Sequence, residues 1–506
     1  MPPRTRLDYI WLGVILTAGF LARLVALLWF PGLHHPDEDF QMLEQAHRFA
    51  FGYGVIPWEF EAGIRSPLLP LLLSWLYEAS QFLIGEGPHV YITFTRIVLA
   101  AMSLAGVAAI FLMGLRRSRT HAIIGGVVGA SWFELVYFSF RTMPEAISLN
   151  LLLIVLSMAT YRQTALRRQE LIAAGFCLAA AVMVRLQFAP AIAIVAIYVS
   201  ILNPPGNWRP MLMGASAPIL AFGAADWIAW GAPFFSQFAT VRANLFEGVA
   251  STFGVQPFGW YFSGALERYS GVAAVLGCLV LFSDKNLRLW VIVGITIIAT
   301  HLAIPHKEYR FVFPGFVCLT IAAAMTSAEL CRRWSASAGP VKARILLGSV
   351  AVVWMATSLY LAFAPGYAFY WTKYREYVKA ALWLADRSDV CGVLIYDQPT
   401  VGYSFLHHNV PVYMSRYNHL NVTVPNEPIA VPDWNAFNFI ELNRRVLSRF
   451  PPDFQLAHCV GNHDPLDACI LRRDGKCLPT TKMVPLLAER EFGRAPDTVH
   501  NIHNGL

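Results

Sequence analysis

The stretch YIWLGVILTAGFLARLVALLWFP, residues 9–31, holds a single charged side chain, Arg23, in 23 positions. A helix that crosses a bilayer needs about 20 mainly apolar residues, so this stretch predicts a membrane-spanning helix. Arg4 and Arg6 precede it. The run is too long for an ordinary signal peptide and lacks a small-residue cleavage site, so we expect an uncleaved anchor.

The composition of the whole chain extends this interpretation. Of 506 residues, 56% are hydrophobic and 14% charged, whereas soluble domains have about 45–50% apolar and about 25% charged residues. These values exclude an ordinary soluble protein, a disordered chain and a coiled coil. The net charge of +7 does not indicate nucleic-acid binding, because arginines cluster in short loops between apolar segments, where membrane topology explains them.

About eleven apolar segments are predicted to cross the membrane: 9–31, 88–114, 120–139, 145–161, 171–184, 189–202, 211–231, 270–283, 289–305, 311–330 and 345–365. Basic clusters fall on alternate loops, which predicts an N-terminus inside and everything from residue 366 onward outside. A further apolar run, 67–85, would break this alternation. We expect it to be an interfacial or re-entrant helix on the outer face.

Unusual polar residues gather on the predicted outer side. Charged side chains inside predicted spans, Arg23, Arg96, Glu134 and Asp226, each fall in the outer half of a helix. Such residues often mark a functional site because a buried charge is costly. The alternative is an arginine that extends to the interface, or a solvated helix end.

An acidic cluster, His35-Pro36-Asp37-Glu38-Asp39, directly follows the first span. Pro36 suits the first turn of a helix, and the carboxylates after it would lie at the positive helix end. The pattern downstream predicts an amphipathic helix resting on the membrane. Two alternatives stay open, a simple capped surface helix and a metal site, for which the available ligands are His35, Asp37, Glu38 and His47 without a standard spacing.

The segment HKEYR, residues 306–310, places three potentially cationic side chains and one carboxylate at a predicted membrane face. Arginine binds phosphate through two parallel hydrogen bonds, and lysine adds a point charge. The segment therefore predicts a phosphate site, with interfacial anchoring as the alternative.

Several motifs together resemble a known family. HPDEDFQMLEQAHRFAFGYGVIPWEF with GIRSPLLP (residues 35–70), FGVQPFGWYF (253–262) and HKEYRFVFP (306–314) occur in the same order as motifs of the mannosyltransferases that use dolichyl-phosphate mannose. These enzymes build N-glycans and GPI anchors and form family twenty-two of the GT-C glycosyltransferases. Asp226 is placed like the family's aspartate in a short Asp-aromatic stretch.

The chain also departs from the family pattern. Gln256 and Gly259 stand where the family has histidines, and its Arg-Pro-Thr turn is Arg185-Leu186-Gln187 here. The Asn-Ser-x-Glu turn is replaced by Arg141-Thr142-Met143-Pro144-Glu145, which keeps an arginine and a glutamate. These changes concern the acceptor and the sugar more than the type of reaction.

The resemblance implies transfer of a hexose, most simply mannose, from a polyprenyl-phosphate donor to a glycan or glycolipid acceptor by an inverting single displacement. Asp37 is the expected base, with Glu38 the alternative, because one carboxylate must take the acceptor proton. His306, Lys307 and Arg310, with Arg65 as a weaker candidate, would bind the donor phosphate. The remaining predicted substrate-binding residues are His35, Gln41, Trp58, Glu59, Arg141, Glu145, Arg185, Asp226, Gln256, Trp260, Tyr261 and Glu308.

The implied fold is a mainly α, polytopic helix bundle of GT-C type over residues 1–365, with interfacial helices in the first outer loop, 32–87. Its partners would be the donor, the acceptor and membrane lipids, without nucleic acid. We expect no cofactor, although a divalent metal stays open. A lipid-sugar transporter and a non-catalytic subunit of a glycan assembly complex are the rival functions.

The more polar segment 366–506 predicts a small mixed α/β domain outside the membrane, with strands near 392–397, 410–414 and 468–477 and a helix near 437–449. Its four cysteines, Cys391, Cys459, Cys469 and Cys477, predict two disulfides of open connectivity, with a zinc site using His463 as the alternative. Arginine-rich usage and a single glycosylation sequon at Asn421 favour a bacterial inner membrane with a periplasmic site. The endoplasmic reticulum, with a lumenal site, is the alternative.

Overall fold

The computed structural model describes residues 5–204, 208–337, 339–396, 401–414, 431, 433–461 and 467–481. The chain forms two compact units. Unit 1 comprises Met1–Trp29, Ile97–Trp227 and Ala232–Phe369, and unit 2 comprises Phe30–Arg96, Ile228–Gly231 and Tyr370–Leu506. The first-loop residues and the C-terminal segment therefore share one unit, although several hundred residues separate them in sequence.

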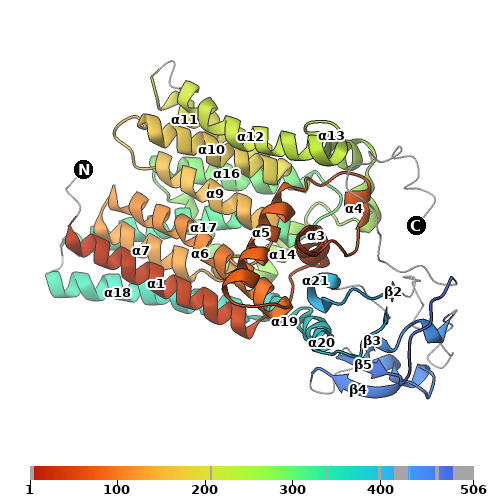
Figure 1. Ribbon diagram of the computed structural model, residues 1–506. Helices are drawn as coiled ribbons and strands as arrows, with labels where there is room; N and C mark the ends of the chain where they lie inside the picture. Colours follow the sequence, from red (N-terminus) through yellow and green to blue (C-terminus); the bar gives the residue numbers. More distant parts are fainter. Residues whose placement is uncertain are drawn as a thin grey trace. The chain divides into compact units, whose positions relative to one another are not determined.

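Unit 1 is a bundle of helices (Figure 1). Its longer helices are α1 (Arg6–Trp29), α6 (Pro88–Leu115, which begins in unit 2), α7 (Arg119–Ser131), α9 (Pro144–Ala159), α10 (Arg168–Val184), α11 (Ala189–Ile201), α12 (Trp208–Trp230, which ends in unit 2), α16 (Arg288–Leu302), α17 (Tyr309–Ala336) and α18 (Pro340–Phe363). Shorter ones are α8 (Phe133–Tyr137), α13 (Phe235–Val241), α14 (Trp260–Tyr269), α15 (Val272–Leu281) and α19 (Pro365–Thr372).

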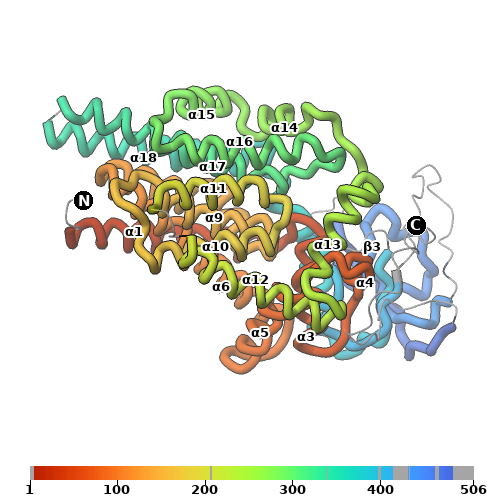
Figure 2. The backbone as a smooth tube through the Cα atoms, turned by 90° about the horizontal axis from the view of Figure 1, so that it is seen from above, coloured from red at the N-terminus to blue at the C-terminus, as the bar shows by residue number. Residues whose placement is uncertain are grey.

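All the predicted apolar spans are largely helical. Among the described residues, six helices are long and apolar enough to cross a membrane, or seven if α14 and α15, which bend by 109° at their junction, form one span (Figure 2). The predicted number of about eleven crossings, and the interfacial placement of 67–85, which forms helix α5 (Leu68–Leu83), stay predictions.

Helix α17 forms the core of unit 1. It contacts α7, α9, α15, α16 and α18, and its side chains at Val312, Phe313, Val317 and Cys318 are fully buried. Glycines allow the closest approach, since a Cβ on Gly294 of α16 would lie 2.8 Å from the Gly315 oxygen of α17. This tight core fixes the start of α17, where the HKEYR segment lies.

The two arginines predicted within spans do not extend to an interface. Arg23 of α1 is 1% exposed, and its guanidinium donates to the Ala130 oxygen at 2.8 Å and to Ser103 Oγ at 2.8 Å. In unit 2, Arg96 is also buried and donates to the Pro31 oxygen at 2.8 Å. The snorkelling alternative is therefore wrong for both side chains, which instead bind backbone carbonyl groups.

The first-loop part of unit 2 is built from short helices: α2 (Pro36–Glu38), a π-helix η1 (Asp39–Leu43), α3 (Glu44–Phe51), α4 (Trp58–Glu61) and α5. The polar stripe expected on a membrane-resting amphipathic helix is instead buried, since Gln41, Glu44 and Arg48 are each at most 8% exposed. Gln41 donates to Glu59 and Arg48 to Gln45, both of the first loop, whereas Glu44 accepts from the Ser404 N–H of the C-terminal segment. The apolar neighbours Met42 and Leu43 join one core with Val378, Val401 and Phe405.

The C-terminal part of unit 2 contains the helices α20 (Arg375–Ala385) and α21 (Tyr403–Leu406) and a five-stranded sheet with the order β2-β1-β3-β5-β4. The strands are β1 (Val393–Ile395), β2 (Val412–Met414), β3 (Phe439–Asn443), β4 (Gln455–Cys459) and β5 (Ala468–Arg472). β1 pairs in parallel with β2 and β3, whereas β5 pairs antiparallel with β3 and β4. The predicted mixture of helices and strands in this segment is thus observed, as one part of unit 2.

The predicted helix at 437–449 is wrong. Phe439–Asn443 forms the central strand β3, which is buried along its whole length, and a 3₁₀ turn (Arg444–Arg449) follows. All five residues of this strand are buried, including the polar Glu441 and Asn443, so the pattern of apolar and polar residues does not show which side chains face the core. Pairing with β1 and β5 decides its conformation.

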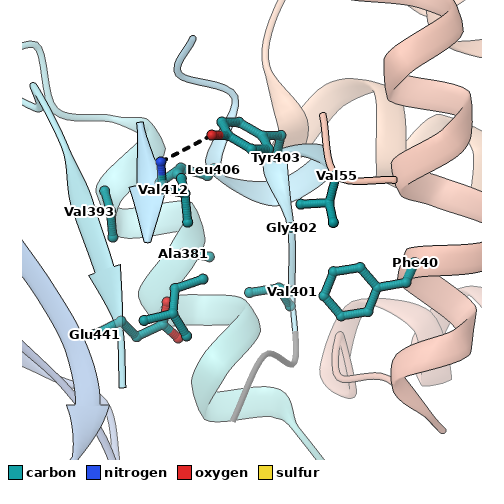
Figure 3. A pocket seen from close by; sticks show the side chains of 11 residues that line it. Phe40, Val55, Ala381, Val393, Val401, Gly402, Tyr403, Leu406, Val412 and Glu441 are labelled. Carbon is teal, nitrogen blue, oxygen red and sulfur yellow. Dashed lines mark hydrogen bonds between the residues drawn. The ribbon is translucent and has the colours of Figure 1, made fainter. Parts of the chain in front are cut away.

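The tail cysteines form the disulfides Cys391–Cys477 and Cys459–Cys469, one of the three possible connectivities. His463 and the Asn421 sequon lie outside the described residues. A small cavity in unit 2 lies beneath the α21 segment (Figure 3). Its lining includes Phe40 and Val55 from the first loop, and Gly402, Tyr403 and Glu441 from the C-terminal part.

Candidate active site

The first-loop carboxylates occupy different environments. His35 precedes α2 as its N-cap, and its Nδ1 accepts from the Asp37 N–H at 3.2 Å and lies 3.1 Å from Asp37 Oδ1. The Asp37 side chain is 25% exposed, whereas that of Glu38 is fully buried. Glu38 accepts from the His34 N–H at 2.9 Å and lies 3.5 Å from Arg96. Of the two predicted catalytic carboxylates, Asp37 is the one with a partly exposed side chain.

Two predicted substrate-binding residues of the first loop pair with each other. Gln41 Nε2 donates to Glu59 Oε1 at 2.9 Å. Burial raises the pKa of Glu59, as does the charge of Asp37, whereas Arg65 lowers it. Trp58 begins the one-turn helix α4 that carries Glu59. The structure therefore brings Asp37, Gln41, Glu59 and Arg65 into one electrostatic neighbourhood of unit 2.

Asp39 and Glu44 are functional candidates that the sequence analysis missed. Both are completely buried and are linked to the C-terminal segment. Burial raises the pKa of Asp39 well above its ordinary value and that of Glu44 to about 7. Nothing local in the sequence signals this arrangement, because the partner Ser404 is 365 residues from Asp39.

Of the four predicted phosphate-binding residues, His306, Lys307 and Arg310 lie together in unit 1, just before and within the first turn of α17, whereas Arg65 lies in unit 2. Glu308 joins the outer two cations: its Oε1 is 2.9 Å from His306 Nε2, and its Oε2 is 2.7 Å from Arg310 Nε. The hydrogen bond with Glu308 raises the pKa of His306. Lys307 donates to the Ile304 oxygen, and burial lowers its pKa.

The aromatic segment 253–262 is joined to this cation cluster. The Gln256 N–H donates to the Pro305 oxygen at 3.0 Å, and His306 Nδ1 bonds the Gly254 oxygen at 2.9 Å. The ring of the buried Tyr261 lies 6.0 Å from Lys307 Nζ, whereas Gln256 is exposed and Trp260 is half-buried. Two predicted motifs, distant from each other in sequence by about 50 residues, thus form one surface of unit 1.

Further predicted residues surround the same part of unit 1. Arg185 Nη2 lies 3.0 Å from Glu145 Oε1, and the Arg185 and Arg310 guanidinium groups lie 4.9 and 5.2 Å from the Phe311 ring centroid. Arg141 is buried against the rings of Tyr137 and Phe140. The structure therefore brings Glu145, Arg185 and Arg310 together.

Asp226 of α12 is fully buried in unit 1. One of its oxygens accepts from the Ser236 N–H at 2.8 Å and from Ser236 Oγ at 2.6 Å. Within the described residues, its Oδ1 has no hydrogen-bond partner. Glu134, the other carboxylate predicted within a span, accepts from Trp132 Nε1, Tyr269 and Tyr309, and so ties α8 to the start of α17.

The conceivable metal ligands of the first loop do not form a cluster. His47 bonds the Tyr53 oxygen at 3.0 Å and His407 Nδ1 at 3.1 Å, and Glu38 is engaged as described above. Over the described ranges, no group of three or more His, Cys, Asp or Glu side chains could hold a metal ion.

The fold and these motifs define a membrane-embedded glycosyltransferase architecture of the GT-C type. Over 93% of this chain and 99% of the other, the fold is similar to the crystal structure of ArnT from Cupriavidus metallidurans bound to undecaprenyl phosphate, with a TM-score of 0.61 at 14% sequence identity. The apo structure of ArnT gives a TM-score of 0.57. At this identity the likeness establishes the fold alone.

The chain belongs to the Alg9-like mannosyltransferase family, whose model matches residues 14–380. It is 27% identical over 300 residues to GPI mannosyltransferase 3 of Yarrowia lipolytica, covering 57% of each chain. It is 25% identical over 372 residues to GPI mannosyltransferase 3 of Drosophila melanogaster, covering 70% of this chain and 63% of that one. The chain thus spans roughly three fifths of the length of these relatives.

Proposed function

We propose that the protein transfers a mannosyl residue from a polyprenyl-phosphate donor to a hydroxyl of a glycan or glycolipid acceptor, with inversion at the sugar carbon. Membership of the mannosyltransferase family supports the sugar and the reaction. ArnT from Cupriavidus metallidurans, which has a similar fold, has been crystallised bound to undecaprenyl phosphate. This relation supports a polyprenyl phosphate as the donor.

The accessible carboxylate of Asp37 is the observation that carries the proposal. An inverting displacement needs one base to take the proton of the acceptor hydroxyl. Asp37 lies at the first turn of α2 with its side chain 25% exposed, whereas Glu38 is fully buried beside Arg96. We therefore assign the base role to Asp37 and assign Glu38 to ordering the loop.

The leaving group is a phosphate whose negative charge grows in the transition state, so fixed cations stabilise it. We assign Lys307 and Arg310 to this role, with His306 beside them. Glu308 holds Arg310 in a defined orientation through two short contacts. Arg65 of unit 2 is a weaker candidate.

The two disulfides of the tail favour an oxidising compartment for that segment. A periplasm and the lumen of the endoplasmic reticulum both meet this condition. We propose that the active site faces such a compartment, with the bacterial periplasm as our first choice.

The test uses the purified full chain in lipid nanodiscs with a panel of radiolabelled polyprenyl-phosphate sugars. Asp37→Asn should lower transfer by at least about 100-fold while donor binding is retained. Asp453→Asn, at an exposed tail position, is the matched control. Full activity of Asp37→Asn would remove Asp37 from the base role.

The phosphate assignment is tested separately. Lys307→Ala and Arg310→Ala should weaken donor use by about 100-fold or more, whereas Lys342→Ala, at an exposed position, should not. If the first two variants lost activity only in proportion to lost folded protein, the assignment would be wrong. In sealed proteoliposomes, donor moved from one leaflet to the other without sugar in a product would instead support a transporter.

A further inference from the structure

The helix that carries Asp37 and Glu38 contains one π turn directly after them. The Glu44 N–H donates to the Asp39 oxygen, five residues back, in place of the usual four. This spacing places the Asp39 and Glu44 side chains on one face of the helix, which an α-helix would not do. π turns of this kind are frequently found at functional sites.

Both carboxylates bind one short segment of the C-terminal part of unit 2. Asp39 Oδ2 accepts from the Gly402 N–H at 2.6 Å, and Asp39 Oδ1 accepts from Ser404 Oγ. Glu44 Oε2 accepts from the Ser404 N–H at 2.7 Å, while its Oε1 accepts from the Val55 N–H at 2.6 Å. We name the four residues Asp39, Glu44, Gly402 and Ser404 the 39–404 latch.

Two further contacts join the same elements. Tyr91 donates from its hydroxyl to the Ser404 oxygen at 2.5 Å, and His47 Nε2 lies 3.1 Å from His407 Nδ1. Position 402 requires glycine for this close approach, because a Cβ on any other residue would lie 2.5 Å from Glu44 Oε2. Figure 3 shows Gly402 beside Val55 and Phe40 at the edge of the cavity.

Buried carboxylates are a costly way to hold two segments together. Apolar side chains of similar size often give equal or greater stability, whereas buried hydrogen-bonded polar groups favour one relative position of the two segments. The same first-loop segment is also held at its start, where the Leu33 N–H donates to the Lys373 oxygen at 3.2 Å. Residues 33–44 are therefore attached at both ends to chain that follows residue 370.

From this geometry we propose that the 39–404 latch positions Asp37 for proton abstraction, so that Gly402 and Ser404 of the C-terminal segment are positioning residues of the transferase. This inference rests on the proposed function of Asp37. Asp39 follows Asp37 by two residues, so a shift of the latch displaces the base. A displacement of about 1 Å at a reacting group lowers a rate by about 100-fold.

The test compares Ser404→Ala with Ser404→Thr, which keeps the hydroxyl, and with Ser448→Ala, a control at an exposed position of the same segment. Steady-state transfer gives kcat and the donor KM, and thermal unfolding reports folding. We expect Ser404→Ala to lower kcat about tenfold or more with an unchanged donor KM and an unchanged unfolding temperature. Ser404→Thr should recover most of kcat.

Asp39→Asn changes the same contact from the other side and provides a second test if Ser404→Ala folds poorly. Hydrogen exchange of residues 36–44 should be faster in both variants, since the latch no longer restrains that segment. Unchanged kcat in both variants overturns the inference, as does a loss of activity that only follows lost folded protein and that Ser404→Thr does not recover.

The controls separate this inference from the proposed function. An inactive Asp37→Asn together with fully active latch variants would reject the latch alone. An active Asp37→Asn would reject the base assignment, and with it the premise of the latch.

Discussion

The buried carboxyl group of Glu441 predicts how the stability of unit 2 depends on pH. It lies on the central strand β3, is 3% exposed and lines the apolar cavity beside Gly402 and Tyr403 (Figure 3). Burial raises the pKa of the Glu441 carboxyl from 4.5 to about 8. The folded state therefore holds a proton that the unfolded chain has already lost at neutral pH.

The sign and size of the effect follow from this difference in pKa. Because the folded-state pKa is the higher one, the folded state binds more protons between about pH 4.5 and 8. Stability is full below pH 4.5 and decreases as the pH rises to 8, by about 5 kcal/mol in total at 1.36 kcal/mol per unit. Glu441→Gln should remove this dependence, because glutamine does not titrate.

The assay is hydrogen exchange of the β1 and β3 amides in the purified full chain at several pH values, corrected for the intrinsic exchange rate. The free energy of local opening should fall with pH in the wild type and stay level in Glu441→Gln. Asp453→Asn should behave like the wild type. An equal pH dependence in the wild type and in Glu441→Gln would refute the reasoning, since another group would then carry the proton.

Three further predictions follow. Replacing both Cys391 and Cys477 by serine should destabilise the tail by about 4 to 5 kcal/mol, and replacing both Cys459 and Cys469 by about 3 kcal/mol, because the sequence separations are 86 and 10. Denaturation of the two double variants measures both losses of stability. A larger loss for the Cys459 and Cys469 variant would contradict this reasoning. Gly175→Ala should lower the stability by about 1–3 kcal/mol or more, because a Cβ on this residue of α10 would lie 1.8 Å from the Met211 oxygen of α12. A Cβ on Gly277 of α15 would meet nothing within 4 Å, so Gly277→Ala is the control. Equal unfolding temperatures of the two variants would argue against the close contact between α10 and α12. Acidification below about pH 6.5 should loosen α21, because burial lowers the pKa of His47 to about 3 and also lowers that of the neighbouring His407, so that protonation is coupled to opening; His47→Gln should reduce this effect in hydrogen exchange of Tyr403–Leu406.

Hydropathy along the sequence correctly predicts most of the helices of unit 1. The predicted span 88–114 is α6 (Pro88–Leu115), and 145–161 is α9 (Pro144–Ala159). Long apolar runs identify such helices because each one satisfies its own backbone hydrogen bonds. The order of motifs also indicated the family, which the match over residues 14–380 establishes.

Predictions from the sequence are wrong or missing where contacts with distant segments determine the local structure. The strand Phe439–Asn443 depends on pairing with β1 and β5, and the π turn at 39–43 accompanies contacts with a segment more than 360 residues away. Local periodicity contains neither kind of information. Asp39 and Glu44 were missed for the same reason, since nothing near them in the sequence identifies Ser404 as their partner.

These contacts also narrow the choice of base among the six acidic residues of the polar stretch 34–66 within the first loop. Glu38, Asp39, Glu44 and Glu59 are each at most 8% exposed, and all four accept hydrogen bonds within unit 2. A carboxylate that already fixes the backbone cannot take an acceptor proton without releasing that contact. Glu61 is exposed but ends the single turn of α4, whereas Asp37 is accessible and is held by His35. The loop therefore combines exposure with a fixed orientation at Asp37, and this combination is what a general base requires.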